Sequence, residues 1–192
     1  IVSFFKIIKL FLFMTMTAES GKGKWANRFI IAAIIQSIFA AAWTIPIVDP
    51  YIKPSVAMVM AAGSAGTWFT VGYVLYVSLG VVGVAVTGLV YQHFEVVRGK
   101  TFKGVSNVLA WMHLILLNVG VAAASWLLMI AGYFGEADLL PVAEGGKGLT
   151  PGQVHVIYLS HFITPVGAFV IVTVIGVIIG ALALLAVNLQ KQ

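Results

Sequence analysis

Hydrophobic residues fill four long stretches of this chain, and polar residues are gathered in the segments between them. The stretches run over 29–48, 66–91, 105–133 and 154–187, and none contains Asp, Glu, Lys or Arg. Each provides the roughly 20 residues that a helix needs to cross about 30 Å of hydrocarbon. The runs are continuous and do not alternate with polar positions, which favours helices over barrel strands. The pattern predicts an all-α integral membrane protein, an up-down bundle of four transmembrane helices in one domain over 29–190.

Composition indicates lipid as the medium in which this chain folds. Of its 192 residues, 61% are hydrophobic and 9% are charged, whereas soluble domains carry about 25% charged residues. The net charge of +5 does not indicate a nucleic-acid partner, because Lys and Arg stand in short clusters beside the apolar stretches. The chain has no cysteine, which excludes disulfides, cysteine-ligated iron–sulfur clusters and covalently attached c-type haem.

The distribution of Lys and Arg predicts the orientation of the bundle. Nine of the 11 precede the first stretch, lie between the second and third, or follow the fourth. The other two loops hold one each, Lys53 and Lys147. Because cytoplasmic loops carry the excess of positive residues, we expect both termini in the cytoplasm, in a multi-pass protein of the cell (plasma) membrane.

Residues 1–28 form the expected cytoplasmic N-terminal segment, and residues 1–13, IVSFFKIIKLFLF, allow three interpretations. They are apolar with two lysines but too short to cross a membrane. They fit an interfacial amphipathic helix, or a signal-peptide-like start that lacks a small-residue cleavage site. In the third interpretation they are not native, and the protein starts at Met14 or Met16.

Histidines are the main candidates for chemistry, because an ionisable group inside a bilayer is a candidate for function. His113 lies about eight residues into the third span, and His161 lies about seven residues into the fourth, counted from opposite sides of the membrane. At 1.5 Å per residue their depths of roughly 12 Å and 11 Å place the rings within roughly 7 Å of each other along the membrane normal. Two imidazoles from different helices are the usual ligands of haem b. We therefore take His113 and His161 as candidate haem ligands, with structural hydrogen bonding and contact with another metal or a quinone as alternatives.

Two further residues fit a cofactor site beside these histidines. Gly120 is seven residues after His113, on nearly the same helix face, and would leave room for the edge of a haem. Pro165 follows His161 by four residues and removes the helical partner of its carbonyl, which predicts a kink or a local opening. Glycines and prolines also occur in purely structural membrane helices, so a packing role is the alternative for both.

The remaining polar residues of the spans carry weaker predictions. His155 and His93 lie near span ends and are metal-site candidates, although an ordinary interfacial position explains each of them. Gln36 and Asn118 are predicted to form hydrogen bonds between helices, and the GxxxG at 176–180 predicts a close helix contact.

The third stretch resembles a known family. Residues 110–135 read AWMHLILLNVGVAAASWLLMIAGYFG, which resembles the histidine-bearing helices of the haem–copper (cytochrome c or quinol) oxidase subunit I superfamily. The second stretch, which contains several glycines, resembles these helices as well, so the resemblance covers about two helices. It implies that His113 faces a haem. The chain lacks the adjacent His-His pair and the HPEVY-like segment of that family's copper site, so oxygen reduction by this chain alone is not expected.

These features leave three functional hypotheses. The first is an electron-transfer subunit of a redox or respiratory complex that binds haem b. The second is a non-catalytic accessory subunit of a larger membrane enzyme, such as an oxidase or a monooxygenase. The third is a small transporter or channel, which the absence of charged residues from the spans disfavours. Enzymatic activity is at most electron transfer, since the chain has no catalytic constellation of its own. We expect other membrane subunits or further copies of the chain as partners.

Overall fold

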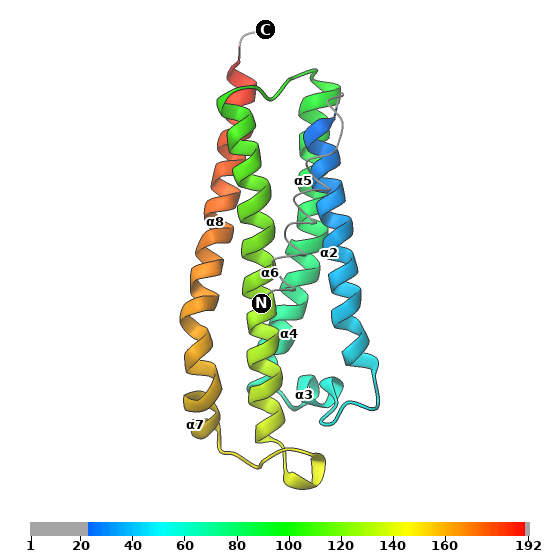
Figure 1. The fold of residues 1–192 in the computed structure, drawn as a ribbon, viewed down its shortest axis with the longest axis vertical. Coiled ribbons are helices and arrows are strands. Elements are labelled where there is room, and N and C mark those ends of the chain that lie inside the picture. Colours follow the sequence, from blue (N-terminus) through cyan, green and yellow to red (C-terminus); the bar gives the residue numbers. More distant parts are fainter. Residues whose placement is uncertain (1–22, 191–192) are drawn as a thin grey trace, which may run out of the picture.

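The computed structural model describes residues 23–190, and every regular element within them is a helix. Four helices are long and apolar enough to cross a membrane, and they stand side by side as an upright bundle (Figure 1). They cover Lys24–Val48, Gly66–Val97, Val105–Leu139 and Pro151–Leu189. The predicted four-helix bundle is confirmed, and each helix is longer than its hydrophobic stretch because flanking polar residues continue it. The segment 1–13, with its three interpretations, lies outside the described residues.

Two of these long helices, the second and the fourth, are divided into shorter α-helical and π-helical elements. In chain order the elements are α2 (Lys24–Val48), α3 (Val56–Ala62), α4 (Gly66–Leu75), the π-helical η1 (Tyr76–Gly83), α5 (Val84–Gln92), the π-helical η2 (His93–Val97), α6 (Val105–Leu139), the 3₁₀ turn η3 (Val142–Glu144), α7 (Pro151–Val154), the π-helical η4 (His155–Leu159) and α8 (Ser160–Leu189). The fourth long helix starts at a capping box, in which the Thr150 hydroxyl accepts from Gln153 N and the Gln153 side chain accepts from Thr150 N. Pro151 takes the first helical position, where its missing N–H has no cost.

The two ends of the bundle differ in the segments that they contain. The terminal end holds the start of α2, the α5–α6 connection and the end of α8, and the loop end holds the segments 49–65 and 140–150 (Figure 1). At the terminal end, Lys100 Nζ donates to the carbonyl oxygens of Asn188 (3.4 Å) and Gln190 (3.3 Å). This contact ties the connection between α5 and α6 to the end of α8.

Helices α6 and α8 pack against each other through glycines. A Cβ added at Gly176 would lie 2.7 Å from the backbone nitrogen of Leu117, and one added at Gly120 would lie 2.7 Å from the backbone nitrogen of Thr173. The GxxxG at 176–180 is therefore a close helix contact, as predicted, because only glycine lets the two backbones approach so far.

The bundle divides into two helix pairs that separate towards the terminal end. Helix α4 packs against α6 near the loop end, where a Cβ added at Gly132 would lie only 2.2 Å from the backbone nitrogen of Phe69. Beyond η1, α5 follows α2 and leaves the α6–α8 pair (Figure 1). The separation produces a gap between α5 on one side and α6 with α8 on the other.

A buried polar network joins three of the helices. Gln36 Nε2 donates to Asn118 Oδ1 at 3.1 Å, the Tyr76 hydroxyl donates to Gln36 Oε1, and Asn118 Nδ2 donates to the Leu114 carbonyl at 2.8 Å. The prediction that Gln36 and Asn118 bond between helices is confirmed. Every polar group in this chain of contacts has a partner, so the network fixes the relative positions of α2, η1 and α6.

Two buried glutamates cap helix starts. The Glu95 carboxylate accepts from Trp25 N at 2.9 Å and from Ala26 N at 3.0 Å, at the first turn of α2. At the loop end, Glu136 Oε2 accepts from Gly66 N at 3.0 Å, at the first residue of α4. A carboxylate at a helix N terminus satisfies N–H groups that have no partner within the helix and interacts favourably with the helix dipole.

Candidate functional site

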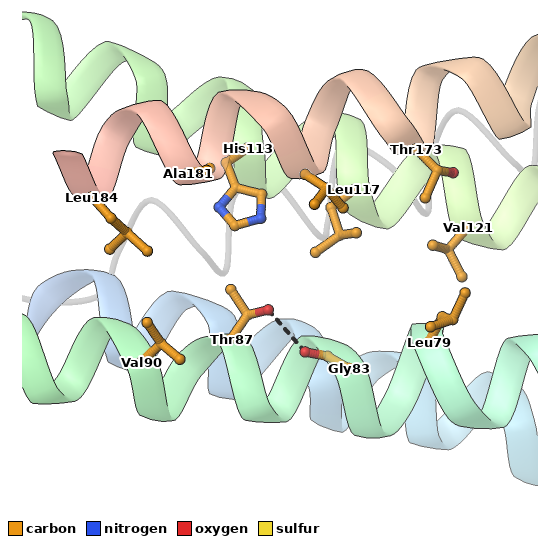
Figure 2. A pocket seen from close by; sticks show the side chains of 12 residues that line it. Leu79, Gly83, Thr87, Val90, His113, Leu117, Val121, Thr173, Ala181 and Leu184 are labelled. Atoms are coloured by element: carbon orange, nitrogen blue, oxygen red, sulfur yellow. Dashed lines mark hydrogen bonds between the residues drawn. The ribbon is translucent and has the colours of Figure 1, made fainter. Parts of the chain in front are cut away.

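A pocket of about 360 Å³ lies in the gap between the helix pairs (Figure 2). Its walls come from η1 and α5 on one side and from α6 and α8 on the other. The lining residues are Leu79, Gly83, Thr87, Val90, His113, Leu117, Val121, Thr173, Val177, Gly180, Ala181 and Leu184. Most of this lining is aliphatic, and none of it is charged.

The threonine hydroxyls of the lining are already engaged by their own helices. Thr87 Oγ1 donates to the Gly83 carbonyl at 2.8 Å, and Thr173 Oγ1 donates to the Phe169 carbonyl at 2.9 Å. His113 is therefore the lining side chain that has a hydrogen-bond donor left to offer to a ligand, since both threonine hydroxyls already donate.

The His113 ring is held firmly on α6. Only 6% of the residue is exposed, and the ring lies directly on Gly180, where an added Cβ would be 2.3 Å from both Cε1 and Nδ1. The Phe29 ring also packs against the imidazole, with the ring centroids 5.0 Å apart. Figure 2 shows the imidazole projecting from α6 into the gap, towards Thr87.

The hydrogen bond between His113 and Tyr91 indicates which nitrogen of the imidazole carries the proton. Nδ1 lies 3.1 Å from the Tyr91 hydroxyl, and Nε2 has no hydrogen-bond partner among residues 23–190. Tyr91 is fully buried, and within the same residues its hydroxyl has no hydrogen bond other than the one to Nδ1. A buried hydroxyl donates wherever it can. We therefore infer that Tyr91 donates to Nδ1 and that the neutral ring carries its hydrogen on Nε2.

The π-helical segment η1 helps to shape the pocket. Its residues Leu79 and Gly83 line the cavity, and α5 departs from α6 directly after it. A π-helical stretch changes the phase of a helix and is often found at functional sites. In this bundle it accompanies the point at which the second long helix turns from α6 to α2.

The structure does not bring His113 and His161 together. His161 is exposed, and its Nδ1 lies 3.4 Å from the hydroxyl of the neighbouring Ser160. The His113 ring sits on Gly180, which follows His161 by 19 residues on the same helical run and so lies about 28 Å from it along the axis. The predicted match in depth is wrong, because helices of 35 and 39 residues extend well beyond a 30 Å layer. One haem iron cannot take both rings as ligands.

The other predicted site residues have structural surroundings. Gly120 packs on the backbone of Thr173, which leaves no room there for the edge of a haem. Pro165 is half-buried within α8, and the helix continues through it. His93 and His155 are exposed, and no group of three or more His, Cys, Asp or Glu side chains suited to a metal ion occurs within residues 23–190.

Sequence reasoning missed the residues that surround His113 at the terminal end. The sequence indicates only an interfacial position for Tyr91, although Tyr91 and His113 lie within a few turns of the connection between the second and third helices. Antiparallel neighbours place such positions at the same level, so this signal was available. Arg28, whose guanidinium carbon lies 4.6 Å from the Trp25 ring centroid and 4.2 Å from that of Trp111, was also missed.

Comparisons with protein-family models, with curated proteins and with solved structures give no match to this chain. The resemblance of 110–135 to oxidase subunit I therefore stays a prediction, and the function has to be inferred from the geometry around His113.

Proposed function

We propose that this chain is a multi-pass membrane subunit that holds an apolar small molecule between its helices and works within a larger redox complex. The observation that carries this proposal is the uncharged pocket of about 360 Å³ with one available imidazole. Small-molecule sites have volumes of roughly 300–1,000 Å³, mostly apolar walls and a few placed polar groups. This pocket has all three features.

The membrane setting is supported by the outer faces of the helices. In three of the four long helices, only 22% of the most apolar 18-residue segment is buried within the bundle. Large side chains such as Ile171 and Ile178 have more than half of their surface exposed. Apolar faces of this extent need lipid or other membrane subunits to cover them. Such subunits, or further copies of the chain, are the partners that we propose, and the charge pattern favours cytoplasmic termini.

The redox setting is supported by the resemblance of the third helix to oxidase subunit I. A transport function finds less support, because no carboxylate or cation lines the pocket. Native electrophoresis of mild-detergent extracts is expected to show the chain in an assembly much larger than its 20.5 kDa. Migration as a monomer alone would contradict the subunit role.

Filling the pocket is expected to remove its ligand. Ala181 lines the cavity and is exposed in the isolated bundle, so Ala181→Phe can project its ring into the gap without displacing the core. Native mass spectrometry of the chain released from membranes should show a bound small molecule on the natural protein and at least a tenfold lower occupancy on this variant.

Ala168→Phe is the matched control, since Ala168 lies exposed on the same helix and does not line the pocket. Its occupancy should equal that of the natural chain. An empty pocket in the natural protein, or equal occupancy in all three proteins, would rule out the proposed function.

A further inference from the structure

We propose that the ligand of this pocket presents a carbonyl oxygen to the Nε2–H of His113, as a quinone ring or an acyl ester does. The inference rests on the proposed ligand-binding function and adds the chemical class of the ligand. Its basis is a side chain that is more than nine-tenths buried, is aimed into a cavity and has a polar atom without a partner among residues 23–190.

The Tyr91 hydroxyl determines what His113 can offer. It lies 3.1 Å from Nδ1, and with this hydroxyl as the donor the imidazole presents a donor at Nε2 and requires an acceptor in the pocket. Coordination of a metal or a haem iron needs the lone pair of Nε2, and the ring hydrogen would then move to Nδ1. That exchange would leave the hydroxyl hydrogen of a fully buried tyrosine without an acceptor among residues 23–190, which is unfavourable. The site therefore favours a hydrogen-bond acceptor over a metal.

The rest of the lining determines what kind of acceptor fits. No charged side chain lines the cavity, so a phosphate or an ammonium group would be buried without a counter-ion, at a large energetic cost. Aliphatic side chains such as Val90, Leu117, Val177 and Leu184 cover the remaining walls and suit an apolar ring or chain. A neutral carbonyl on an apolar body matches both the single donor and these walls.

A pair of probes that differ in their carbonyl groups tests this inference. The chain is placed in nanodiscs of ether-linked lipids, which carry no ester carbonyl, and binding of decyl-benzoquinone is compared with binding of decylbenzene. We expect the quinone to bind about tenfold more tightly than decylbenzene, because one buried hydrogen bond usually contributes about this factor to affinity. His113→Phe should abolish this preference, and His161→Phe, which replaces an exposed histidine, should preserve it.

Infrared spectroscopy detects a hydrogen bond to the quinone directly. If His113 had only a structural role, the quinone C=O band would not shift. The quinone C=O band should shift to lower wavenumber in the natural protein and stay unshifted with Ala181→Phe. This comparison needs no change at His113, so it decides the question even if His113→Phe does not fold. An unshifted band in the natural protein would overturn the inference.

The outcomes separate the two levels of the proposal. Equal binding of both probes would overturn the carbonyl inference and leave the apolar pocket as a binding site, whereas binding of neither probe would overturn both. Exchange into ester-linked lipids without quinone identifies the source. A shift of the ester band that disappears with His113→Phe supports the inference with a lipid acyl ester as the ligand, and the absence of that shift, with quinone binding intact, supports it with a quinone.

Discussion

Replacing Gly176 by leucine is expected to force α8 away from α6 and to destabilise the bundle by about 3 kcal/mol. The added Cβ would lie 2.7 Å from the backbone nitrogen of Leu117 and 3.1 Å from the carbonyl carbon of Leu116. Backbone atoms cannot rotate out of the way as the end of a side chain can, so the helices themselves must move apart. Reversible unfolding in mixed dodecyl maltoside and SDS micelles, followed by circular dichroism, measures the loss.

Gly167→Leu is the matched control on the same helix. A Cβ at Gly167 meets nothing within 4 Å, so the expected change is within about 0.5 kcal/mol. If both variants lost the same stability, the cost would come from leucine in this helix in general, and the close α6–α8 contact would be refuted.

Replacing Glu95 by alanine is expected to destabilise the terminal end by about 3 kcal/mol or more, the range seen when one partner of a buried charge arrangement is removed. Glu95 is only 8% exposed, and its carboxylate accepts from the backbone N–H groups of Trp25 and Ala26. It also attracts the buried guanidinium of Arg28. Its removal would leave the first turn of α2 without its cap and the cation without this carboxylate.

Hydrogen exchange measures this effect where it should arise. The amides of Trp25 and Ala26 should exchange much faster in Glu95→Ala, and Glu95→Gln, which keeps one acceptor oxygen, should fall between the variant and the natural protein. Glu144→Ala removes an exposed acid in a loop-end turn and is the control. Unchanged protection of these two amides in Glu95→Ala would show that the carboxylate does not cap α2.

The architecture could be predicted because hydropathy alone determines it. Long continuous apolar stretches have few ways to satisfy their backbone in lipid other than as helices, and the amide pair Gln36–Asn118 and the 176–180 glycines followed from general rules of helix contact. The exact ends of the helices, and the contacts made there, were less predictable. Glu95 and Arg28 look like ordinary flanking charges in the sequence, and only the packing of the terminal end shows that they are buried.

Only part of the candidate site could be predicted from the sequence. His113 was identified because an imidazole stands out in an apolar helix, but its partner was wrong. The depth estimate treated each helix end as a membrane boundary, whereas α6 alone has 35 residues and is about 52 Å long. The pocket itself could not be predicted, because it depends on where the second long helix leaves α6, and no residue pattern marks the η1 segment in advance.

The state of the His113 ring is the most direct test of the account. Solid-state NMR of the ¹⁵N-histidine-labelled chain in nanodiscs of ether-linked lipids, with His113 assigned by its loss in His113→Phe, reports which nitrogen is protonated. We predict a protonated Nε2 and an unprotonated Nδ1, with the Nε2 signal moving when decyl-benzoquinone is added. A proton on Nδ1 with a bare Nε2, or a spectrum that the quinone leaves unchanged, would contradict the account.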